Sequence, residues 1–403
     1  MTIACPDCGA LTEIPPLPPR SKAVCRLCDG DLEKTSGRSI SAALACSLAT
    51  FLLLMPSNGL RFLRVDVFGM KAENVIGGGV LMLWNHGWVI VAGFTAIYVL
   101  ILPFFRFGLL TSVLGAVQLG RRPPWLGPAF RWAVWLDAWA MSDVFLLASF
   151  VGYYRLINVS EITVTIGLGG ACFMAAAFLT MLSRATLDKR TVWRAIMPET
   201  QFDSSEETIS CTTCDLVQPI SCEGNPCPRC GAILRTRKRD ALPRTAALLV
   251  AAFVLFFPSN FYPMEVSTQL GSSVDYTIFT GVRQLYENSL YPLAVLIFCT
   301  SIVIPLAKIL ALAWCVLSVW RNSNRHLLMK TKIFRVVAEL GRWSKTDPFT
   351  IVVFVPLMAF DGLGSATAGW GAAAFMLMTS LTMAASSTFD PRLMWDVASP
   401  GPR

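Results

Sequence analysis

Eight of the thirteen cysteines form two groups of four, and each group consists of two Cys-x2-Cys pairs. The members are Cys5, Cys8, Cys25 and Cys28 in the first group, and Cys211, Cys214, Cys227 and Cys230 in the second. Each pair supplies two thiolates from one tight turn, and two such turns close the tetrahedral sulfur shell that Zn²⁺ prefers. Because four thiolates leave no open position for water, we predict two structural zinc ribbons rather than catalytic metal sites.

Other chemistry fits the same cysteines less well. A rubredoxin-like iron centre uses the same four ligands, and we favour zinc over iron. Disulfides are disfavoured because both segments are predicted to lie in the reducing cytoplasm. Cys222 has no counterpart in the first group, and the remaining four cysteines stand singly in apolar runs, where cysteine behaves as a small hydrophobic residue.

The elements around these ribbons are apolar enough to cross a membrane. Of the 403 residues, 54% are hydrophobic and only 15% are charged, whereas a soluble domain carries about a quarter charged residues. A bilayer span needs roughly 20 mainly apolar residues, fewer when flanking side chains reach the headgroups. The apolar runs predict eight spans, at 40–55, 88–105, 144–157, 165–182, 246–257, 290–320, 351–360 and 372–385. The sequence therefore predicts an all-α polytopic membrane protein.

The basic residues predict the orientation of these spans. Most of the 34 Lys and Arg residues flank the spans on the side that holds both termini and the central segment. Cytoplasmic loops carry this excess, so both termini are expected to be cytoplasmic. The net charge of +8 then reflects topology, and we predict no nucleic-acid partner because no basic soluble domain is present.

The chain is a tandem repeat with an offset of 202 residues. Pro56-Ser57-Asn58 recurs as Pro258-Ser259-Asn260, and Trp193 recurs as Trp395. Each unit is a cytoplasmic ribbon followed by four spans, and both units have the same orientation because their span number is even. The predicted parts are ribbon 1 (1–38), transmembrane domain 1 (39–186), a linker with ribbon 2 (187–238) and transmembrane domain 2 with a cytoplasmic tail (239–403). Partial alternation in 60–71 and 261–280 predicts short extracytoplasmic β elements.

Charged residues inside or beside the spans are the candidates for function. Lys308 lies within the sixth span and Asp347 begins the seventh, and the repeat places Arg106 and Asp143 at the equivalent positions. Intramembrane charges are costly, usually paired and often functional. The structural alternatives are that Lys308 extends to the headgroups, that Asp347 caps a helix before Pro348, and that Arg106 and Asp143 form a structural pair.

The rest of the sequence carries no recognised catalytic apparatus. His86 and His326 are the only histidines and stand alone, so no histidine dyad can form. The chain also lacks a Walker A motif, a dinucleotide fingerprint and a nucleophile elbow. We therefore do not expect an enzyme.

The sequence resembles the paraquat-inducible protein A family in three features. These are the tandem ribbons, the Pro-Ser-Asn after the first span of each unit, and the run after the last span, Thr388-Phe389-Asp390-Pro391-Arg392-Leu393-Met394-Trp395. The resemblance covers essentially the whole chain. It implies two tetraspanin-like four-helix transmembrane domains in the inner membrane of a Gram-negative bacterium. It also implies a periplasmic MCE-domain (mammalian cell entry) tunnel protein as partner, and phospholipid as cargo that passes between membranes.

By this resemblance, function is expected to concentrate in the polar cluster of the second transmembrane domain, at Lys308, Asp347 and Thr382. The first half departs from the family pattern, with Asp29 after its second cysteine pair and Leu187-Asp188-Lys189-Arg190 in place of Phe-Asp-Pro-Arg. The first repeat is therefore expected to be the more structural one. Two hypotheses remain open: a lipid-transport subunit, and a membrane adaptor or sensor whose ribbons bind a protein or respond to metal or redox state.

Overall fold

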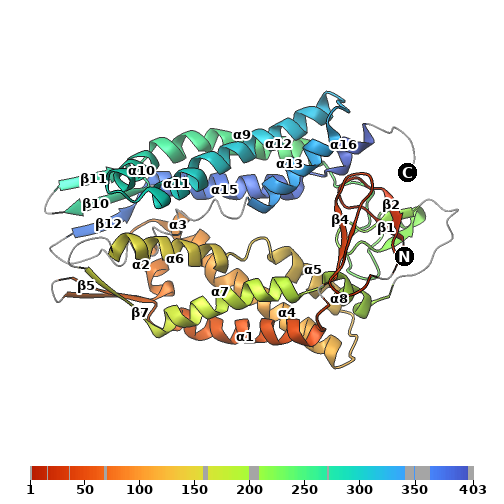
Figure 1. The fold of residues 1–403 in the computed structure, drawn as a ribbon, viewed down its shortest axis with the longest axis horizontal. Helices are drawn as coiled ribbons and strands as arrows, with labels where there is room; N and C mark the ends of the chain where they lie inside the picture. The colour runs from red at the N-terminus through yellow and green to blue at the C-terminus, as the bar shows by residue number, and fades with distance from the viewer. Residues whose placement is uncertain are drawn as a thin grey trace.

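The computed structural model describes residues 2–15, 17–35, 37–67, 70–157, 162–198, 208–269, 272–340, 349 and 364–397. The helices form two bundles that lie side by side along the long axis of the molecule, as Figure 1 shows. Both three-stranded sheets lie at one end, here the sheet end, and both cysteine groups lie at the other, here the ribbon end. Below, the first half is the described part of 40–198 and the second half that of 241–397, while ribbon 1 is the described part of 2–35 and ribbon 2 is 208–238.

The first half is built from eight α-helices, one π-helical turn and three strands. Its elements, in chain order, are α1 (Ile40–Gly59), β5 (Leu63–Val67), β6 (Met70–Asn74), α2 (Ile76–Asn85), α3 (Val89–Thr95), the π turn η1 (Ala96–Ile101), α4 (Leu102–Gln118), α5 (Leu126–Leu136), α6 (Ser142–Ile157), β7 (Ile162–Ile166), α7 (Leu168–Thr186) and α8 (Lys189–Ile196). The long helix α1 packs against both α7 and α4.

The second half repeats this order in the part of it that the structure describes. Its elements are α9 (Ala241–Phe261), β10 (Glu265–Gln269), β11 (Ser272–Tyr276), α10 (Ile278–Glu287), α11 (Tyr291–Phe298), the π turn η3 (Cys299–Val303), α12 (Ile304–Trp320), α13 (Leu327–Leu340), β12 (Gly364–Ala368), α15 (Trp370–Thr388) and α16 (Arg392–Asp396). Here α9 packs against α15 and α12, as α1 does against α7 and α4.

The second span of each half carries a π turn at the same place. Pro103 and Pro305 lie in the first turn of the helix that follows η1 and η3. A proline cannot donate an amide to the preceding turn, so a wider turn before it accommodates the missing hydrogen bond. π turns recur at functional sites, and both of these lie close to the buried bases Arg106 and Lys308.

Five of the eight predicted spans are confirmed by length and composition within the described residues. They are the helical segments Ile40–Gly59, Val89–Gln118, Leu168–Thr186, Ala241–Phe261 and Tyr291–Trp320. The predicted span at 144–157 corresponds to α6, which has 16 residues and is shorter than a perpendicular crossing needs. The span at 372–385 lies in α15, whose 19 residues include many hydroxyl side chains that lower its hydropathy. The span at 351–360 lies outside the described residues.

The predicted β elements are confirmed and are larger than expected. In each half, a hairpin after the first long helix is joined by a third strand that comes just before the last long helix, giving the antiparallel orders β6-β5-β7 and β11-β10-β12. Val65 pairs with Ala72 on one side and Val164 on the other. The predicted fourth span therefore starts too early, because Thr165 and Ile166 belong to strand β7.

The two halves contact each other through a shared apolar core. The Trp88 and Trp370 rings meet edge to face with centroids 5.4 Å apart. The Tyr98 hydroxyl in η1 donates a hydrogen bond of 3.2 Å to Ser380 Oγ in α15. The halves are thus packed against each other at the depth of their helices.

The ribbons are made of short antiparallel hairpins at the ribbon end. Ribbon 1 pairs β1 (Thr2–Ala4) with β2 (Leu11–Glu13), and β3 (Lys22–Val24) with β4 (Asp31–Lys34). Ribbon 2 pairs β8 (Thr208–Ser210) with β9 (Val217–Pro219), followed by the 3-10 turn η2 (Ile220–Cys222) and a bridge between Pro226 and Ile233. Strands of three or four residues bury little apolar surface, so these hairpins need a further source of stability, such as a bound metal ion.

Candidate functional sites: two metal centres and buried charges

Each predicted cysteine group converges on one point. Within each group the four sulfur atoms lie within 4.8 Å of one another, and all eight cysteines are buried. The Sγ–Sγ distance is 3.5 Å for Cys5–Cys28, and the matching Cys211–Cys230 distance in ribbon 2 is also 3.5 Å. Tetrahedral bonds of about 2.3 Å place neighbouring sulfurs about 3.8 Å apart, whereas a disulfide bond is about 2.0 Å long. Both groups therefore fit a metal ion coordinated by four thiolates.

The backbone of each cysteine pair forms the turn that such a site requires. In the first pair, Gly9 N donates to Cys5 O at 2.9 Å and Cys5 N donates to Ala10 O at 2.9 Å. The residue after the second cysteine takes a left-handed conformation in all four pairs, at Gly9, Asp29, Asp215 and Gly231. Glycine adopts this conformation without strain and aspartate is among the residues that tolerate it. Asp29, a departure from the family pattern, is thus compatible with the same turn.

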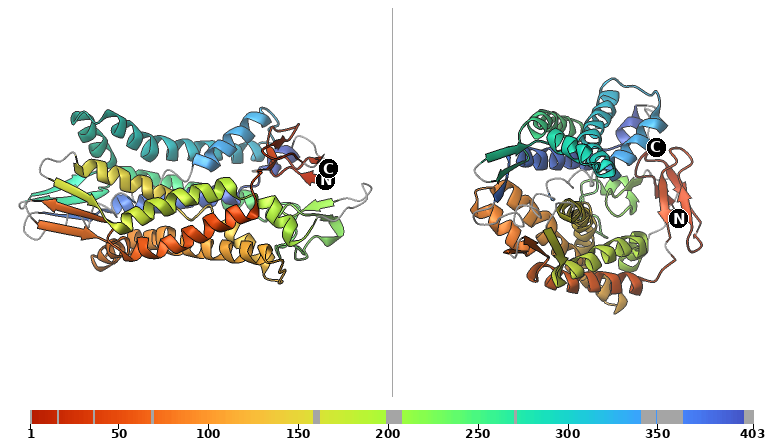
Figure 2. Two further views of the ribbon diagram at one scale, coloured as in Figure 1. Left: turned by 60° about the horizontal axis from the view of Figure 1, so that its bottom comes forward. Right: turned by 60° about the vertical axis from the view of Figure 1, so that its left-hand side comes forward.

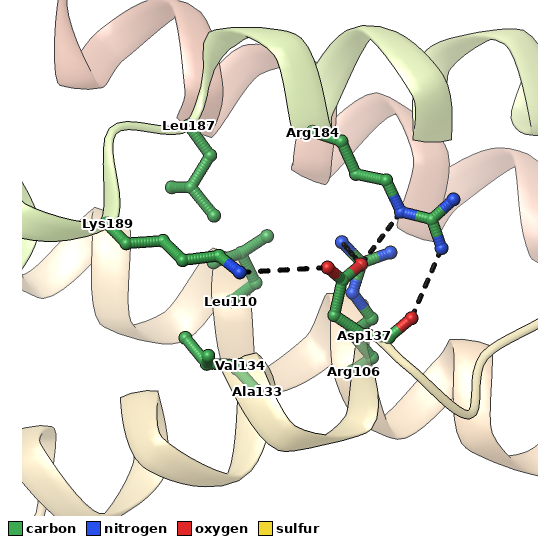
Figure 3. A pocket seen from close by; sticks show the side chains of 8 residues that line it. All are labelled: Arg106, Leu110, Ala133, Val134, Asp137, Arg184, Leu187 and Lys189. Atoms are coloured by element: carbon green, nitrogen blue, oxygen red, sulfur yellow. Dashed lines mark hydrogen bonds and ion pairs between the residues drawn. The ribbon is translucent and has the colours of Figure 1, made fainter. Parts of the chain in front are cut away.

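The first half holds a network of five charged side chains, and Figure 3 shows four of them, Arg106, Asp137, Arg184 and Lys189, around a small cavity of about 100 Å³. Arg106 Nη2 lies 2.7 Å from Asp137 Oδ1, and Arg184 Nε lies 2.8 Å from the same oxygen. Arg184 also forms an ion pair with Asp143, and Lys189 Nζ lies 3.9 Å from Asp137 Oδ2. Burial alone would raise the pKa of Asp137, but the charges of Arg106, Arg184 and Lys189 hold that pKa below its ordinary value.

This network changes the predicted Arg106–Asp143 pair. The structure brings both residues together, yet Asp137 and Arg184 stand between them as the shared partners. The sequence predicts neither of them as a partner: Asp137 lies between predicted spans, and Arg184 is one of the basic residues that predict the orientation. The sequence feature that could have identified them is their position. Asp137 lies just before α6 and Arg184 near the end of α7, and both reach the same depth as Arg106.

The second half arranges its polar residues differently. Lys308 is only 2% exposed, and its Nζ has no hydrogen-bond partner among the residues that the structure describes. Thr382 is also buried, and its hydroxyl donates to Thr379 O at 2.8 Å. Ser386 occupies the position that Arg184 has in the first half, at the offset of 202. Asp347 lies outside the described residues, so its predicted approach to Lys308 stays a prediction.

Sequence comparison finds relatives that match 98% of the chain. The chain is 30% identical over 406 residues to the intermembrane transport protein PqiA of Escherichia coli K12, covering 98% of this chain and 95% of that protein. It is 27% identical to the lipophilic envelope-spanning tunnel protein A of the same strain, covering 98% and 92%. It is 25% identical to a probable intermembrane transport protein of Haemophilus influenzae, covering 98% and 96%.

No solved structure matches the chain. The model of the paraquat-inducible protein A family matches twice, at residues 40–197 and 242–399, once in each repeat. The matched segments cover both sets of membrane helices and leave the two ribbons outside. Together with the full-length identity to the PqiA protein, this double match shows that the chain belongs to the paraquat-inducible protein A family.

Proposed function

We propose that this protein is the inner-membrane subunit of an intermembrane lipid transport system, in which it passes phospholipid between the inner membrane and a periplasmic MCE-domain tunnel protein. The printed names of the relatives, an intermembrane transport protein and an envelope-spanning tunnel protein, support such a role. The membrane helices supply the contact with lipid. The tetraspanin-like four-helix arrangement of each half is part of the same proposal.

The observation that carries the proposal is the burial of Lys308. An ammonium group at membrane depth is costly and persists where it is paired or used. Its repeat equivalent, Arg106, is an ion-pair partner of Asp137 in the first half, whereas Nζ of Lys308 makes no hydrogen bond to any described residue. Lys308 and Thr382, with Asp347, are the residues to which we assign transport, either by contacting a lipid headgroup or by coupling transport to proton movement.

The orientation follows from charge. The Lys and Arg residues concentrate at the ribbon end of the helices, which predicts that the ribbons and both termini face the cytoplasm. The two sheets then face the periplasm, where a tunnel partner would bind. The ribbons would hold zinc in a purely structural role, because four thiolates leave no open coordination position. The protein would not be an enzyme, since the sequence carries no recognised catalytic motif.

The experiment is phospholipid transfer by the complex of this chain and its co-purified periplasmic partner, reconstituted in vesicles with a labelled phospholipid. Lys308→Met is expected to lower transfer at least tenfold, and Lys308→Arg to retain part of it because the positive charge stays. Asp347→Asn is expected to abolish transfer while the protein still inserts. The exposed Lys332→Met is the matched control and should transfer normally.

Wild-type transfer by Lys308→Met, or wild-type transfer by Asp347→Asn, would contradict the assignment of these residues. Co-purification of a cytoplasmic protein through the ribbons, with no periplasmic partner and no transfer, would instead support the adaptor or sensor hypothesis.

A further inference from the structure

The two ribbons cross over between the halves. In sequence, ribbon 1 comes before the first half, yet its cysteines belong to the same buried apolar cluster as Phe389 and Trp395 of the second half. Ribbon 2 comes before the second half, yet its cysteines share a cluster with Phe130 and Trp193 of the first half. Figure 2 shows the strands of ribbon 1 beside the C-terminal end of the described chain in both views.

Polar contacts hold ribbon 1 on the second half. Arg335 of α13 donates from Nε to Asp7 Oδ2 at 2.7 Å, and from Nη2 to Cys28 O at 3.1 Å and Cys28 Sγ at 3.2 Å. Arg392 of α16 donates from Nε to Pro6 O at 3.2 Å. The guanidinium of Arg335 therefore touches a metal-ligand sulfur and the turns of both cysteine pairs.

Ribbon 2 is held on the first half in a parallel way. Arg190 of α8 donates from Nη2 to Asp215 Oδ2 at 3.2 Å. At the start of α5, a Cβ on Gly127 would lie only 1.8 Å from Arg229 O. The absence of a side chain at Gly127 lets the helix meet the backbone between Cys227 and Cys230 directly.

One repeated motif provides both docking surfaces. Asp188, Arg190 and Trp193 recur as Asp390, Arg392 and Trp395 at the offset of 202. Asp188 caps α8 by accepting from Thr191 N at 3.3 Å, and Asp390 accepts from Arg392 N at 3.2 Å. In each half the aspartate fixes the turn, the arginine contacts the ribbon of the other half and the tryptophan lies in the ribbon's apolar cluster.

Each ribbon also forms an ion pair with its own half. Arg194 of α8 forms a two-pronged ion pair with the buried Glu33 of ribbon 1, at 2.8 and 3.0 Å. Arg237, near the C-terminal end of ribbon 2, pairs with Asp396 of α16 at 2.7 and 2.5 Å. Arg194 and Asp396 are equivalent at the offset of 202, so the base is on the helix in the first repeat and on the ribbon in the second. An ion pair between ribbon and helix is present in both.

We propose that the ribbons are crossed braces: the Asp-x-Arg-x-x-Trp segment of each half is the docking site for the other half's metal ribbon, and bound metal holds the two halves together at the ribbon end. The fit of four buried thiolates in each ribbon shows which residues would hold the ion. A domain this small folds on its metal, so loss of the metal releases both attachments of that ribbon at once.

The experiment is hydrogen–deuterium exchange on the full-length protein in nanodiscs. Cys25→Ser with Cys28→Ser is expected to lower protection of α13 and α16 at least tenfold and to leave α5 protected. Cys227→Ser with Cys230→Ser is expected to lower protection of α5 and α8 by the same factor and to leave α13 protected. The two variants are matched controls for each other. Loss of protection confined to the half that follows the mutated ribbon, or equal loss in both halves, would overturn the crossing.

A point variant tests the same brace if a double variant fails to accumulate. Arg335→Gln is expected to speed the chelator-driven release of one of the two zinc equivalents about tenfold, as loss of an outer partner of a metal ligand does, and to leave the second equivalent unchanged. Lys332→Gln is the control: Lys332 also pairs with ribbon 1, at Asp29 and 3.0 Å, but both side chains are more than half exposed, so this ion pair contributes little. Release of both equivalents at the wild-type rate from Arg335→Gln would overturn the proposal.

Discussion

The two halves place a base at the same depth of the second span and surround it differently. In the first half, Arg106 belongs to a network with Asp137, Asp143, Arg184 and Lys189, in which each carboxylate has at least one cationic partner. In the second half, Ser386 stands where Arg184 would be, and Lys308 Nζ makes no hydrogen bond within the described residues. Among the described residues, the duplicated scaffold has kept the position of the base and changed its polar partners.

This difference separates stability from function. A closed set of buried ion pairs fixes helices relative to one another, and breaking it leaves an uncompensated buried charge. A buried base that makes no hydrogen bond to the described residues can meet a cargo or a proton. We therefore expect substitutions in the first network to act on folding, and substitutions around Lys308 to act on transport.

The largest expected effect is that of Arg184→Met. Asp143 is nearly inaccessible to solvent and would lose its ion pair with Arg184, which costs about 3–5 kcal/mol for a buried pair. The melting temperature of the purified protein should fall by roughly 10 °C. Lys189→Met is the control, because Lys189 is half exposed and 3.9 Å from Asp137, and it should cost at most about 1 kcal/mol. Equal shifts for the two variants would contradict a closed network.

A smaller effect is expected from pH. The pKa of Asp137 is held below its ordinary value by the neighbouring cations, so its ionised form stabilises the folded state. That contribution is fully present above the unfolded pKa of about 3.9, and it is lost gradually as pH falls from there through the lower folded-state pKa. The melting temperatures of wild type and Asp137→Asn should therefore differ most at pH 7, and the difference should begin to narrow as pH falls below about 4. A gap that stays constant or widens on acidification would contradict the role of Asp137.

The contrast between the halves was only partly readable from sequence. Cysteine spacing was enough to predict both metal clusters, because ligand geometry is local. The repeat was enough to align Arg106 with Lys308. Asp137 and Arg184 were not predicted as partners, because their meeting depends on how α5, α6 and α7 pack, which no local pattern encodes. The crossing of the ribbons could not be predicted for the same reason, since the order of elements along the chain does not show which half each ribbon packs against.

The comparison can be sharpened by giving the second half the missing arginine. Ser386→Arg places a guanidinium at the position that in the first half pairs with Asp143, whose equivalent is Asp347. Neutralising this acid should lower phospholipid transfer about tenfold without lowering the melting temperature. Ser387→Arg is the matched control, because Ser387 is the adjacent residue and exposed. Normal transfer by Ser386→Arg would mean that the halves do not differ in the way proposed.

The smallest expected effect concerns one pair of equivalent threonines. Thr180 and Thr382 are both buried, and each hydroxyl donates to a carbonyl of its own helix, at Ala176 and Thr379. Valine keeps the shape and loses a hydrogen bond worth about 1 kcal/mol, so Thr180→Val and Thr382→Val should lower the melting temperature by similar small amounts. Only Thr382→Val should also lower phospholipid transfer, by about threefold, because its hydroxyl oxygen can also accept a hydrogen bond and it lies in the half to which we assign transport. Equal transfer by the two variants would show that Thr382 serves packing alone, and would leave Lys308 and Asp347 as the polar residues of the transport site.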